Sequence, residues 1–330
     1  MFTIGPYQFT NKLVLAPMAG VTDRPFRQLC RSLGAGMTVS EMISSKADLR
    51  HTRKSQLRMD HQGEPGPIIV QIAGAEAKTM ADAAQYNVDQ GAQIIDINMG
   101  CPAKKVCKLD AGSALLKDPG LVEQILTSVV NAVSVPVTLK TRTGWSIENK
   151  NILKIAEIAQ NSGIQALSIH GRTRQDMYNG NAEYDTITEV CKIIDMPVLA
   201  NGDIDSVQKA KLVMDKTGCS AIMIGRAAQK KPWIFQQIDH YFKTGKIAEE
   251  PTLQQKQNWL TSHLLNLYDF YGEVHGVKIA RKHINWQLND APEYHLVKPE
   301  IMAVKQAEIQ LKRINNYFER QIESSFAKAS

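Results

Sequence analysis

The stretch Asp96-Ile97-Asn98-Met99-Gly100-Cys101-Pro102 contains a cysteine in a setting suited to chemistry. The preceding residues 91–95 are mainly apolar and predict a short buried strand of a parallel sheet. Gly100 and Pro102 end that strand, so Cys101 lies just past its carboxyl end, where α/β sheets collect ligands. Most cysteines are buried small hydrophobic residues, but this turn and its polar neighbours favour a functional thiol. A thiol with an ordinary pKa of ~8.5 is mostly protonated at neutral pH and can act as a general acid.

Polar side chains also follow other apolar segments that predict strands. Lys140 ends the segment 135–139, and His170 ends the segment 166–169. A single lysine or histidine at a strand end is more often a solvated surface residue, but a whole ring of such residues favours a shared site. The ring consists of Met18, Glu41, Gln71, Asn98, Lys140, His170, Asn201 and Gly225-Arg226.

Two glycine-containing loops predict a phosphate site. They are Asn201-Gly202-Asp203 and Gly225-Arg226, which follow the last two predicted strands. Barrels often bind phosphate with these two loops. Glycine lets backbone N–H groups approach the phosphate, and Arg226 offers a charge-assisted contact. Asn-Gly is also an ordinary turn, but with Lys140 nearby the pattern favours an anionic, phosphate-bearing cofactor.

The elements that must position these residues repeat one strand–helix unit. The predicted strands are Leu13–Ala16, Met37–Glu41, Ile68–Ile72, the strand ending at Asn98, Val137–Lys140, Ala166–His170, Val198–Asn201 and Ala221–Ile224. Helices are predicted at residues 22–33, 78–90, 119–133, 184–194 and 206–216. A further helix follows the fifth strand and ends near residue 163, and the last one begins at residue 232. Eight alternations in about 245 residues predict a closed (β/α)8 TIM barrel of the α/β class. A doubly wound open sheet would need a glycine-rich first turn, which is absent here.

The composition changes after the predicted barrel, which we place at residues 1–243. Residues 244–251 predict a linker, and 252–330 a small all-α domain that opens with the capping box Thr252 to Gln255. Helices are expected from 252 to 271, from 276 to 288, and from Pro299 towards Phe326. Basic residues share one face of the middle helix, either as a solvated surface or as a contact for a polyanion. They are Lys278, Arg281 and Lys282.

Charge and cysteine content set the broad class. The 330 residues carry 39 Lys and Arg against 33 Asp and Glu, which is compatible with a polyanionic partner without proving one. The five cysteines form no CxxC pair, so neither a disulfide framework nor a metal site is expected. Neither a signal peptide nor an apolar stretch long enough to cross a bilayer is recognisable. We expect a cytoplasmic protein without membrane contact, with a monomer as the default state.

Motifs along nearly the whole chain resemble those of the tRNA-dihydrouridine synthases. The most specific is Ile95–Pro102 with Val106 and Gly112-Ser113. The others, in the order found in the family, are Ala16–Asp23, Arg142–Trp145, His170–Thr173, Asn201–Ile204 and Gly225–Ala228. Residues 103–106 and 279–283 are most similar to the bacterial B-type branch.

The resemblance implies a flavin-dependent oxidoreductase. Members of the family bind FMN at the barrel mouth, are reduced by NADPH, and reduce one uridine of tRNA to 5,6-dihydrouridine. Hydride would pass from the flavin to C6 of the base, and Cys101 would supply the proton to C5. The implied FMN contacts are Pro17, Met18, Ala19, Gln71, Lys140, His170, Asn201, Gly202, Asp203, Gly225 and Arg226.

The resemblance also implies contacts to the RNA. Asn98 would hydrogen-bond the base, which must be extruded from folded tRNA. The basic residues expected to contact tRNA are Lys104, Lys105, Arg172 and Arg174 at the mouth and Lys278, Arg281 and Lys282 on the helical domain. We expect Cys107 to be structural. The branch suggests a uridine in the D-loop.

Two other classes of function compete with this one. An FMN barrel acting on a free small molecule would give no reason for a basic helical domain. An RNA-binding protein without catalysis would give no reason for Cys101, Lys140 and the phosphate loops to be present together.

Overall fold

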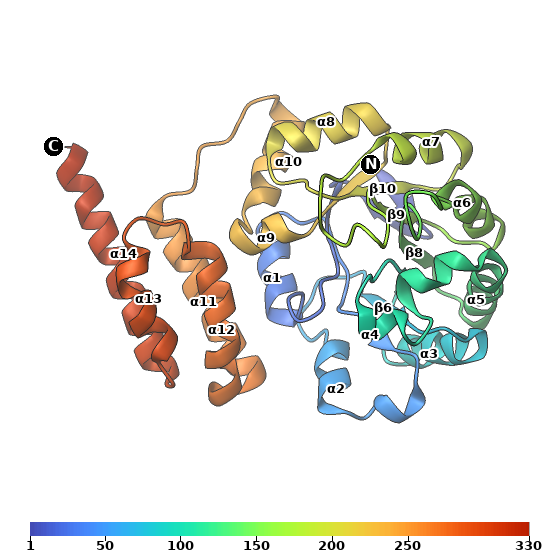
Figure 1. The fold of residues 1–330 in the computed structure, drawn as a ribbon. Helices are drawn as coiled ribbons and strands as arrows, with labels where there is room; N and C mark the ends of the chain where they lie inside the picture. Colours follow the sequence, from blue (N-terminus) through green and yellow to red (C-terminus); the bar gives the residue numbers. More distant parts are fainter. Residues whose placement is uncertain (330) are drawn as a thin grey trace.

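The computed structural model describes residues 1–329 and shows a parallel barrel followed by a group of helices (Figure 1). The strands pair in the order β4-β3-β11-β10-β9-β8-β7-β6-β5. They are β3 (Leu13–Leu15), β4 (Met37–Thr38), β5 (Ile43–Ser44), β6 (Ile69–Ala73), β7 (Ile94–Met99), β8 (Val137–Arg142), β9 (Leu167–His170), β10 (Val198–Asn201) and β11 (Ala221–Ile224). The prediction of a TIM barrel in the α/β class is confirmed.

The second barrel strand differs from the prediction of one continuous strand over 37–41. It is split into β4, which pairs with β3, and β5, which pairs with β6. Between them, the Ser40 backbone N–H donates to the Ile69 carbonyl at 3.0 Å. The Ser40 hydroxyl accepts a 3.0 Å hydrogen bond from the Gln71 backbone N–H. The segment from β4 to β5 therefore pairs with β3 at one end and with β6 at the other, and this closes the barrel.

Helices surround the barrel, and several begin at the predicted caps. Asp23 caps α1 through the Phe26 backbone N–H, and Ser206 caps α8 through the Lys209 N–H. The outer helices are α1 (Arg24–Ser32), α2 (Arg53–Met59), α3 (Ala77–Asp89), α5 (Pro119–Ala132), α6 (Ile152–Asn161), α7 (Asp185–Ile193), α8 (Val207–Thr217) and α10 (Ile234–Thr244). Short additional turns follow the carboxyl ends of three strands: η1 (Ala47–Leu49), α4 (Lys104–Cys107), η2 (Gly112–Lys117) and α9 (Arg226–Lys230).

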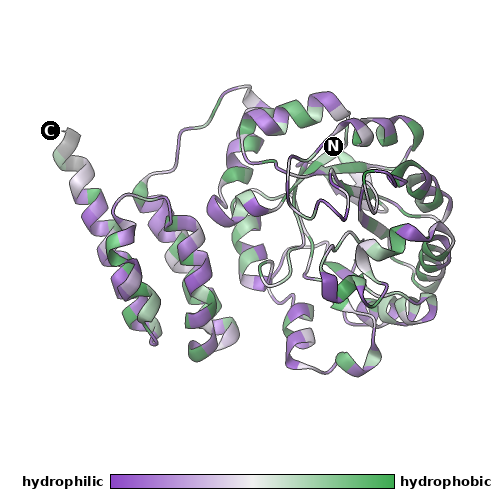
Figure 2. Cartoon of the chain, in the orientation of Figure 1, coloured by the Kyte–Doolittle hydropathy of each residue, from purple (hydrophilic) through white to green (hydrophobic). Residues whose placement is uncertain are grey.

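The strand residues alternate between two hydrophobic cores. Leu13 and Leu15 pack outward against the helices, whereas Val14 lies in a second core inside the barrel. Phe2 and Phe9 of an unpredicted hairpin, β1 (Phe2–Ile4) with β2 (Tyr7–Phe9), join this inner core. Figure 2 shows the resulting hydrophobic strands and the polar outer faces of the helices. By the same alternation, polar residues two apart on one strand reach the barrel interior together.

Four helices form the C-terminal part and share a core of their own. They are α11 (Leu253–Tyr271), α12 (Glu273–Leu288), α13 (Tyr294–Ala303) and α14 (Ala307–Ala329). Leu260 and Leu264 of α11 pack with Ile284 of α12 and Phe318 of α14. The predicted capping box is present, with Thr252 and Gln255 each bonding the other's backbone. The helical domain was predicted to extend to residue 330, which lies outside the residues that the structure describes.

The prediction that Pro299 opens a long third helix is wrong. Pro299 lies inside α13, which begins at Tyr294, and a separate helix, α14, follows from Ala307. Proline favours a first helical turn, but the fully buried Tyr294 packs edge-to-face on Tyr317 of α14, with ring centroids 5.9 Å apart. Tertiary packing thus overrides the local signal.

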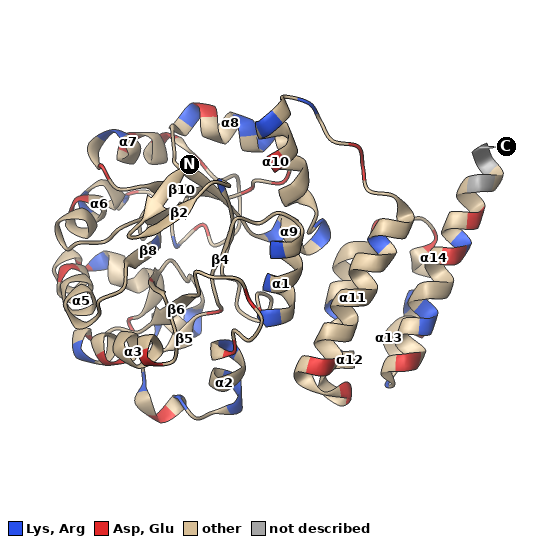
Figure 3. Ribbon diagram, turned by 180° about the vertical axis from the view of Figure 1, so that it is seen from behind, with Lys and Arg blue, Asp and Glu red and all other residues tan. Residues whose placement is uncertain are grey.

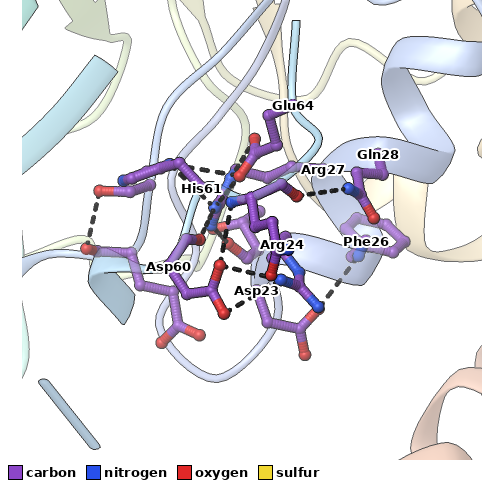
Figure 4. Close-up of polar contacts among 12 residues, drawn as sticks. Asp23, Arg24, Phe26, Arg27, Gln28, Asp60, His61 and Glu64 are labelled. Atoms are coloured by element: carbon purple, nitrogen blue, oxygen red, sulfur yellow. Dashed lines mark hydrogen bonds and ion pairs between the residues drawn. The ribbon is translucent and has the colours of Figure 1, made fainter. Parts of the chain in front are cut away.

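The helical part contacts the barrel in two places, where α11 packs on α1 and where α12 packs on α9 (Figure 1). The Tyr271 hydroxyl donates to the Asp23 carboxylate at 2.9 Å, and the Arg24 guanidinium stacks on Phe270 at 4.6 Å. Figure 4 shows how α1 is itself fastened: Arg24 pairs with Asp60, and Arg27 pairs with Glu64. Within residues 1–329, no helix is long and apolar enough to cross a membrane.

Candidate active site

A cavity of about 950 Å³ opens at the carboxyl ends of the strands. It brings together most of the predicted site residues: Pro17, Met18, Ala19, Gln71, Asn98, Cys101, Lys140, His170, Arg172, Asn201, Gly202, Asp203, Gly225 and Arg226. Glu41 is not among the lining residues; its carboxylate accepts hydrogen bonds from the Gly20 N–H and the Arg58 guanidinium. The described residues contain no group of three or more His, Cys, Asp or Glu that could hold a metal ion.

The Cys101 turn is held from both sides by side chains. The side-chain amide oxygen of Asn98 (Oδ1) accepts hydrogen bonds from the backbone N–H groups of Cys101 and Gly100, at 3.0 and 3.2 Å. The Ser113 hydroxyl donates to the Cys101 carbonyl at 2.9 Å. Gly112 makes this close packing possible: its φ is +63°, and a Cβ there would come within 2.8 Å of the Cys101 carbonyl oxygen. The turn is therefore a fixed element rather than a loose loop.

The half-buried Cys101 thiol is kept in its protonated form. Burial raises its pKa above the ordinary value, and the hydrogen bond from the Ala103 backbone N–H offsets only part of this effect. Cys107, on α4, instead directs its sulfur at the Cys101 carbonyl oxygen, 3.6 Å away. The two thiols therefore have different surroundings.

Lys140 stands in the cavity beside Asn201. Its ammonium donates to the Asn201 side-chain oxygen at 3.0 Å, and the Asn201 amide donates to the Met223 carbonyl at 2.7 Å. Burial, reinforced by the nearby Arg142, lowers the pKa of Lys140 to about 8. Lys140 is thus a positive charge at neutral pH that is close to its titration point.

His170, Arg172, Asp203 and Arg226 form one charged cluster. Arg172 is buried and pairs with Asp203 at 2.6 Å, while Arg226 reaches the other Asp203 oxygen at 2.8 Å. Burial and the surrounding cations, Arg142 first, lower the pKa of His170 to about 2, so His170 is neutral. Burial alone would raise the pKa of Asp203, but hydrogen bonds from Arg172 and the Ala182 N–H lower it overall. The Arg226 side chain is 57% exposed and is the accessible cation of this cluster.

Arg142 also lines the cavity, although the sequence analysis named it only as part of a motif and not as a site residue. Its guanidinium is almost fully buried, donates to the Gly100 carbonyl at 2.8 Å, and lies 5.4 Å from the ring centre of Tyr178. It stands two residues after Lys140 on β8, so strand alternation could have predicted that both point into the barrel.

The residues expected to contact RNA are dispersed. Lys104 and Lys105 are exposed on α4, three and four residues after Cys101, and Arg174 stacks on Trp145 at 4.6 Å. On α12, Lys278 is exposed, whereas Arg281 donates to the Val304 carbonyl and Lys282 to the Gly20 carbonyl of the barrel. Basic residues appear on α1, α2 and α9, while charges of both signs lie along α14 (Figure 3).

Solved structures with low sequence identity share the fold. One is histamine dehydrogenase from Rhizobium sp. 4-9, with a TM-score of 0.54 and 12% identity over 80% of this chain and 50% of that one. Another is a 2-naphthoyl-CoA reductase complex, with a TM-score of 0.57 and 11% identity over 72% of this chain and 51% of that one. At this identity they support the barrel architecture alone.

Sequence relatives are much closer. The chain is 54% identical to tRNA-dihydrouridine synthase B of Pseudomonas aeruginosa, over 96% of both chains. It is 55% identical to the Vibrio vulnificus protein of the same name, over 96% of this chain and 98% of the relative. The family profile described as "Dihydrouridine synthase (Dus)" matches residues 14–323. The chain therefore belongs to the dihydrouridine synthase family.

Proposed function

We propose that the protein binds FMN and uses NADPH to reduce a uridine in the D-loop of tRNA to 5,6-dihydrouridine. The observation that carries this proposal is that the Cys101 thiol shares one cavity with Lys140 and with the loops Asn201–Asp203 and Gly225-Arg226. The names of the near full-length relatives support tRNA as the substrate. We also propose that the enzyme acts in the cytoplasm, where it would meet such a substrate.

The cavity fits a flavin mononucleotide. A volume of about 950 Å³ is at the upper end of small-molecule sites. The Asp203 carboxylate binds Arg172, the Ala182 N–H and Arg226, so an incoming phosphate would meet the loop's backbone N–H groups and would compete with Asp203 for the exposed Arg226.

We assign the remaining flavin contacts by their position in the cavity. The Pro17-Met18-Ala19 backbone would lie against the ring system, and Lys140 with Gln71 would face its polar edge. Lys140 supplies a positive charge there, which favours the negatively charged reduced form. His170 and Asn201-Gly202 complete the cradle on the phosphate side.

The reaction needs a hydride and a proton. A bound FMN would supply the hydride chemistry, for which C6 of the uracil is the expected acceptor. Cys101 gives its Sγ proton to C5, so the 5,6 double bond becomes a single bond and the thiol becomes a thiolate that regains a proton from solvent. Asn98, which lies at the Cys101 turn, is placed to hydrogen-bond the base. The raised thiol pKa ensures that the proton is present before the reaction.

We propose that both parts of the chain hold the tRNA. Residues 1–243 form the catalytic barrel, 244–251 a linker, and 252–330 a tRNA-binding domain. The RNA backbone would contact Lys104, Lys105 and Arg174 at the mouth and Lys278 on the helical domain. The other basic residues expected there are engaged within the protein: Arg172 with Asp203, Arg281 with the Val304 carbonyl and Lys282 with the Gly20 carbonyl. Among these, Lys104, Lys105 and Lys278 are exposed. The extruded base would enter the cavity.

Purified protein tests the proposal directly. It should be yellow, release FMN when denatured, and oxidise NADPH while forming dihydrouridine in tRNA that lacks this modification. Free uridine should not react. A colourless protein would contradict the flavin assignment, and equal turnover on free uridine would favour a small-molecule reductase.

A further inference from the structure

Asp96 is a buried acid beneath the cavity that the mechanism above does not use. It lies on β7 and is 4% exposed, and its neighbours in the sheet register are Gln71 on β6 and Thr138 on β8. Both neighbours donate to it: Gln71 Nε2 to Oδ2 at 2.6 Å, and Thr138 Oγ1 to Oδ1 at 2.6 Å. The charged group that faces it is Lys140.

The hydrogen bonds continue from Asp96 to the Cys101 turn without a gap. Gln71 donates to Asp96 through its amide nitrogen and accepts Asn98 Nδ2 on its amide oxygen at 2.7 Å. Asn98 in turn uses its own amide oxygen to accept the backbone N–H groups of Gly100 and Cys101. Two side-chain amides thus connect the acid to the turn that carries the thiol.

The donors and acceptors in this chain of bonds allow one arrangement. An ionised carboxylate only accepts hydrogen bonds, and a backbone N–H only donates. If the Gln71 amide rotated by half a turn, its NH2 group would face the NH2 of Asn98. If Asn98 then rotated as well, its NH2 would face the N–H groups of Gly100 and Cys101. Each rotation leaves buried donors opposed, which is costly in a site closed to water.

We propose that Asp96 is a positioning residue that fixes the Cys101 turn through the amides of Gln71 and Asn98. This proposal rests on the assigned role of Cys101 as proton donor. Asp96 itself does not touch the reacting atoms. Burial raises the pKa of Asp96 to about 6, although the hydrogen bonds from Thr138 and Gln71 offset part of this rise. Above that pH the carboxyl group is mainly ionised and can only accept hydrogen bonds.

Three nearly isosteric variants test the proposal. Asp96→Leu removes the acceptor, Asp96→Asn keeps one carbonyl that can still accept from Gln71, and Thr138→Val removes the other hydrogen bond to Asp96. Thr138→Val is the matched control, because it takes one hydrogen bond from the same buried acid without interrupting the path to Cys101. The first readout is the rate of Cys101 alkylation by iodoacetamide, followed by peptide mass spectrometry.

We expect Asp96→Leu to change the Cys101 alkylation rate by about fivefold or more, as the turn loses a buried hydrogen-bond anchor. Asp96→Asn should change it less, and Thr138→Val hardly at all. Reoxidation of the reduced protein by tRNA should slow about tenfold to a hundredfold in Asp96→Leu, while flavin reduction by NADPH stays near normal. Gln71→Met, which cuts the path in its middle, should reproduce the alkylation change if Asp96→Leu is not recovered folded.

Two results would overturn the proposal: wild-type alkylation of Cys101 in both Asp96→Leu and Gln71→Met, or an equal change in Thr138→Val. Cys101→Ala, measured in parallel, separates this proposal from the proposed function. If Cys101→Ala is reoxidised normally by tRNA, the proton-donor role fails. The alkylation rates still report whether Asp96 holds the turn.

Discussion

At the scale of single residues, burial changes the protonation behaviour of the side chains in the site. Burial raises the pKa of the Cys101 thiol and lowers the pKa of the Lys140 ammonium, so it favours the neutral form of both groups. The sequence predicted that these groups share a mouth, because polar residues at the ends of apolar strands converge in a barrel. It could not predict the shifts or the bond from Lys140 to Asn201, since both depend on how neighbouring strands pack.

The raised pKa of Cys101 gives a prediction for the free protein. Because a raised pKa leaves less thiolate at a given pH, alkylation of Cys101 should be slower than that of a small thiol at pH 7 to 8. Its rate should rise with an apparent pKa above that of N-acetylcysteinamide, a neutral blocked cysteine measured alongside. An apparent pKa below that of the small thiol would mean that Cys101 is an activated thiolate.

Gly112 should be required for the position of Cys101. An alanine there would meet the Cys101 carbonyl oxygen at 2.8 Å and would hold an unfavourable positive φ. Gly218→Ala is the matched control, because its φ is similar at +64° and nothing lies within 4 Å of the added carbon. Both variants should lose about 1–2 kcal/mol of stability from the backbone alone, measured by urea unfolding. Gly112→Ala should also lose tRNA reduction, and equal activity in the two variants would contradict the fixed turn.

At the scale of elements, most strands and outer helices were predictable from apolar segments and caps such as Asp23 and Ser206. The exceptions have tertiary causes. The second strand is split because Ser40 turns its hydrogen bonds towards β6, and α13 begins at Tyr294 because that side chain fills the helical core. The short helix α9 after Gly225 was not predicted, although its residues were.

Helix α9 carries Arg226, the accessible cation of the proposed phosphate site. Arg226→Ala should weaken FMN binding to the apoprotein by about 10- to 150-fold, the range for a charge-assisted hydrogen bond of roughly 1.5–3 kcal/mol. Because Arg226 is 57% exposed, solvent screening favours the lower end. Fluorescence titration measures the dissociation constant. Lys231→Ala, one residue beyond α9, should bind FMN normally, and normal binding by Arg226→Ala would refute the phosphate assignment.

At the scale of the whole molecule, the basic face predicted on α12 is divided between two roles. Lys282 reaches the Gly20 carbonyl of the barrel, and Arg281 reaches the Val304 carbonyl, while Lys278 is exposed. Helical spacing places these residues together, but only the packing of the helices against the barrel shows which of them make internal contacts. Lys278 is therefore the clearest probe of RNA binding on this part of the chain.

Lys278→Gln should weaken tRNA binding and reduce its salt dependence by about one unit of slope, the effect of one lost phosphate contact. Binding at several salt concentrations measures this slope. NADPH oxidation with oxygen as acceptor should remain unchanged, because it needs only the barrel. Lys192→Gln on the outer helix α7 is the control, and an equal loss in both variants would point to nonspecific charge effects.

We propose that Cys101 donates the proton that completes uridine reduction, and single-turnover kinetics of Cys101→Ala tests this role most directly. Flavin reduction by NADPH and FMN content should stay near normal, because the thiol faces the substrate. Reoxidation of the reduced protein by tRNA should slow by ~10²- to 10⁴-fold, the usual contribution of a general acid, while Cys107→Ala changes it little. Normal reoxidation in Cys101→Ala together with its loss in Cys107→Ala would contradict the account.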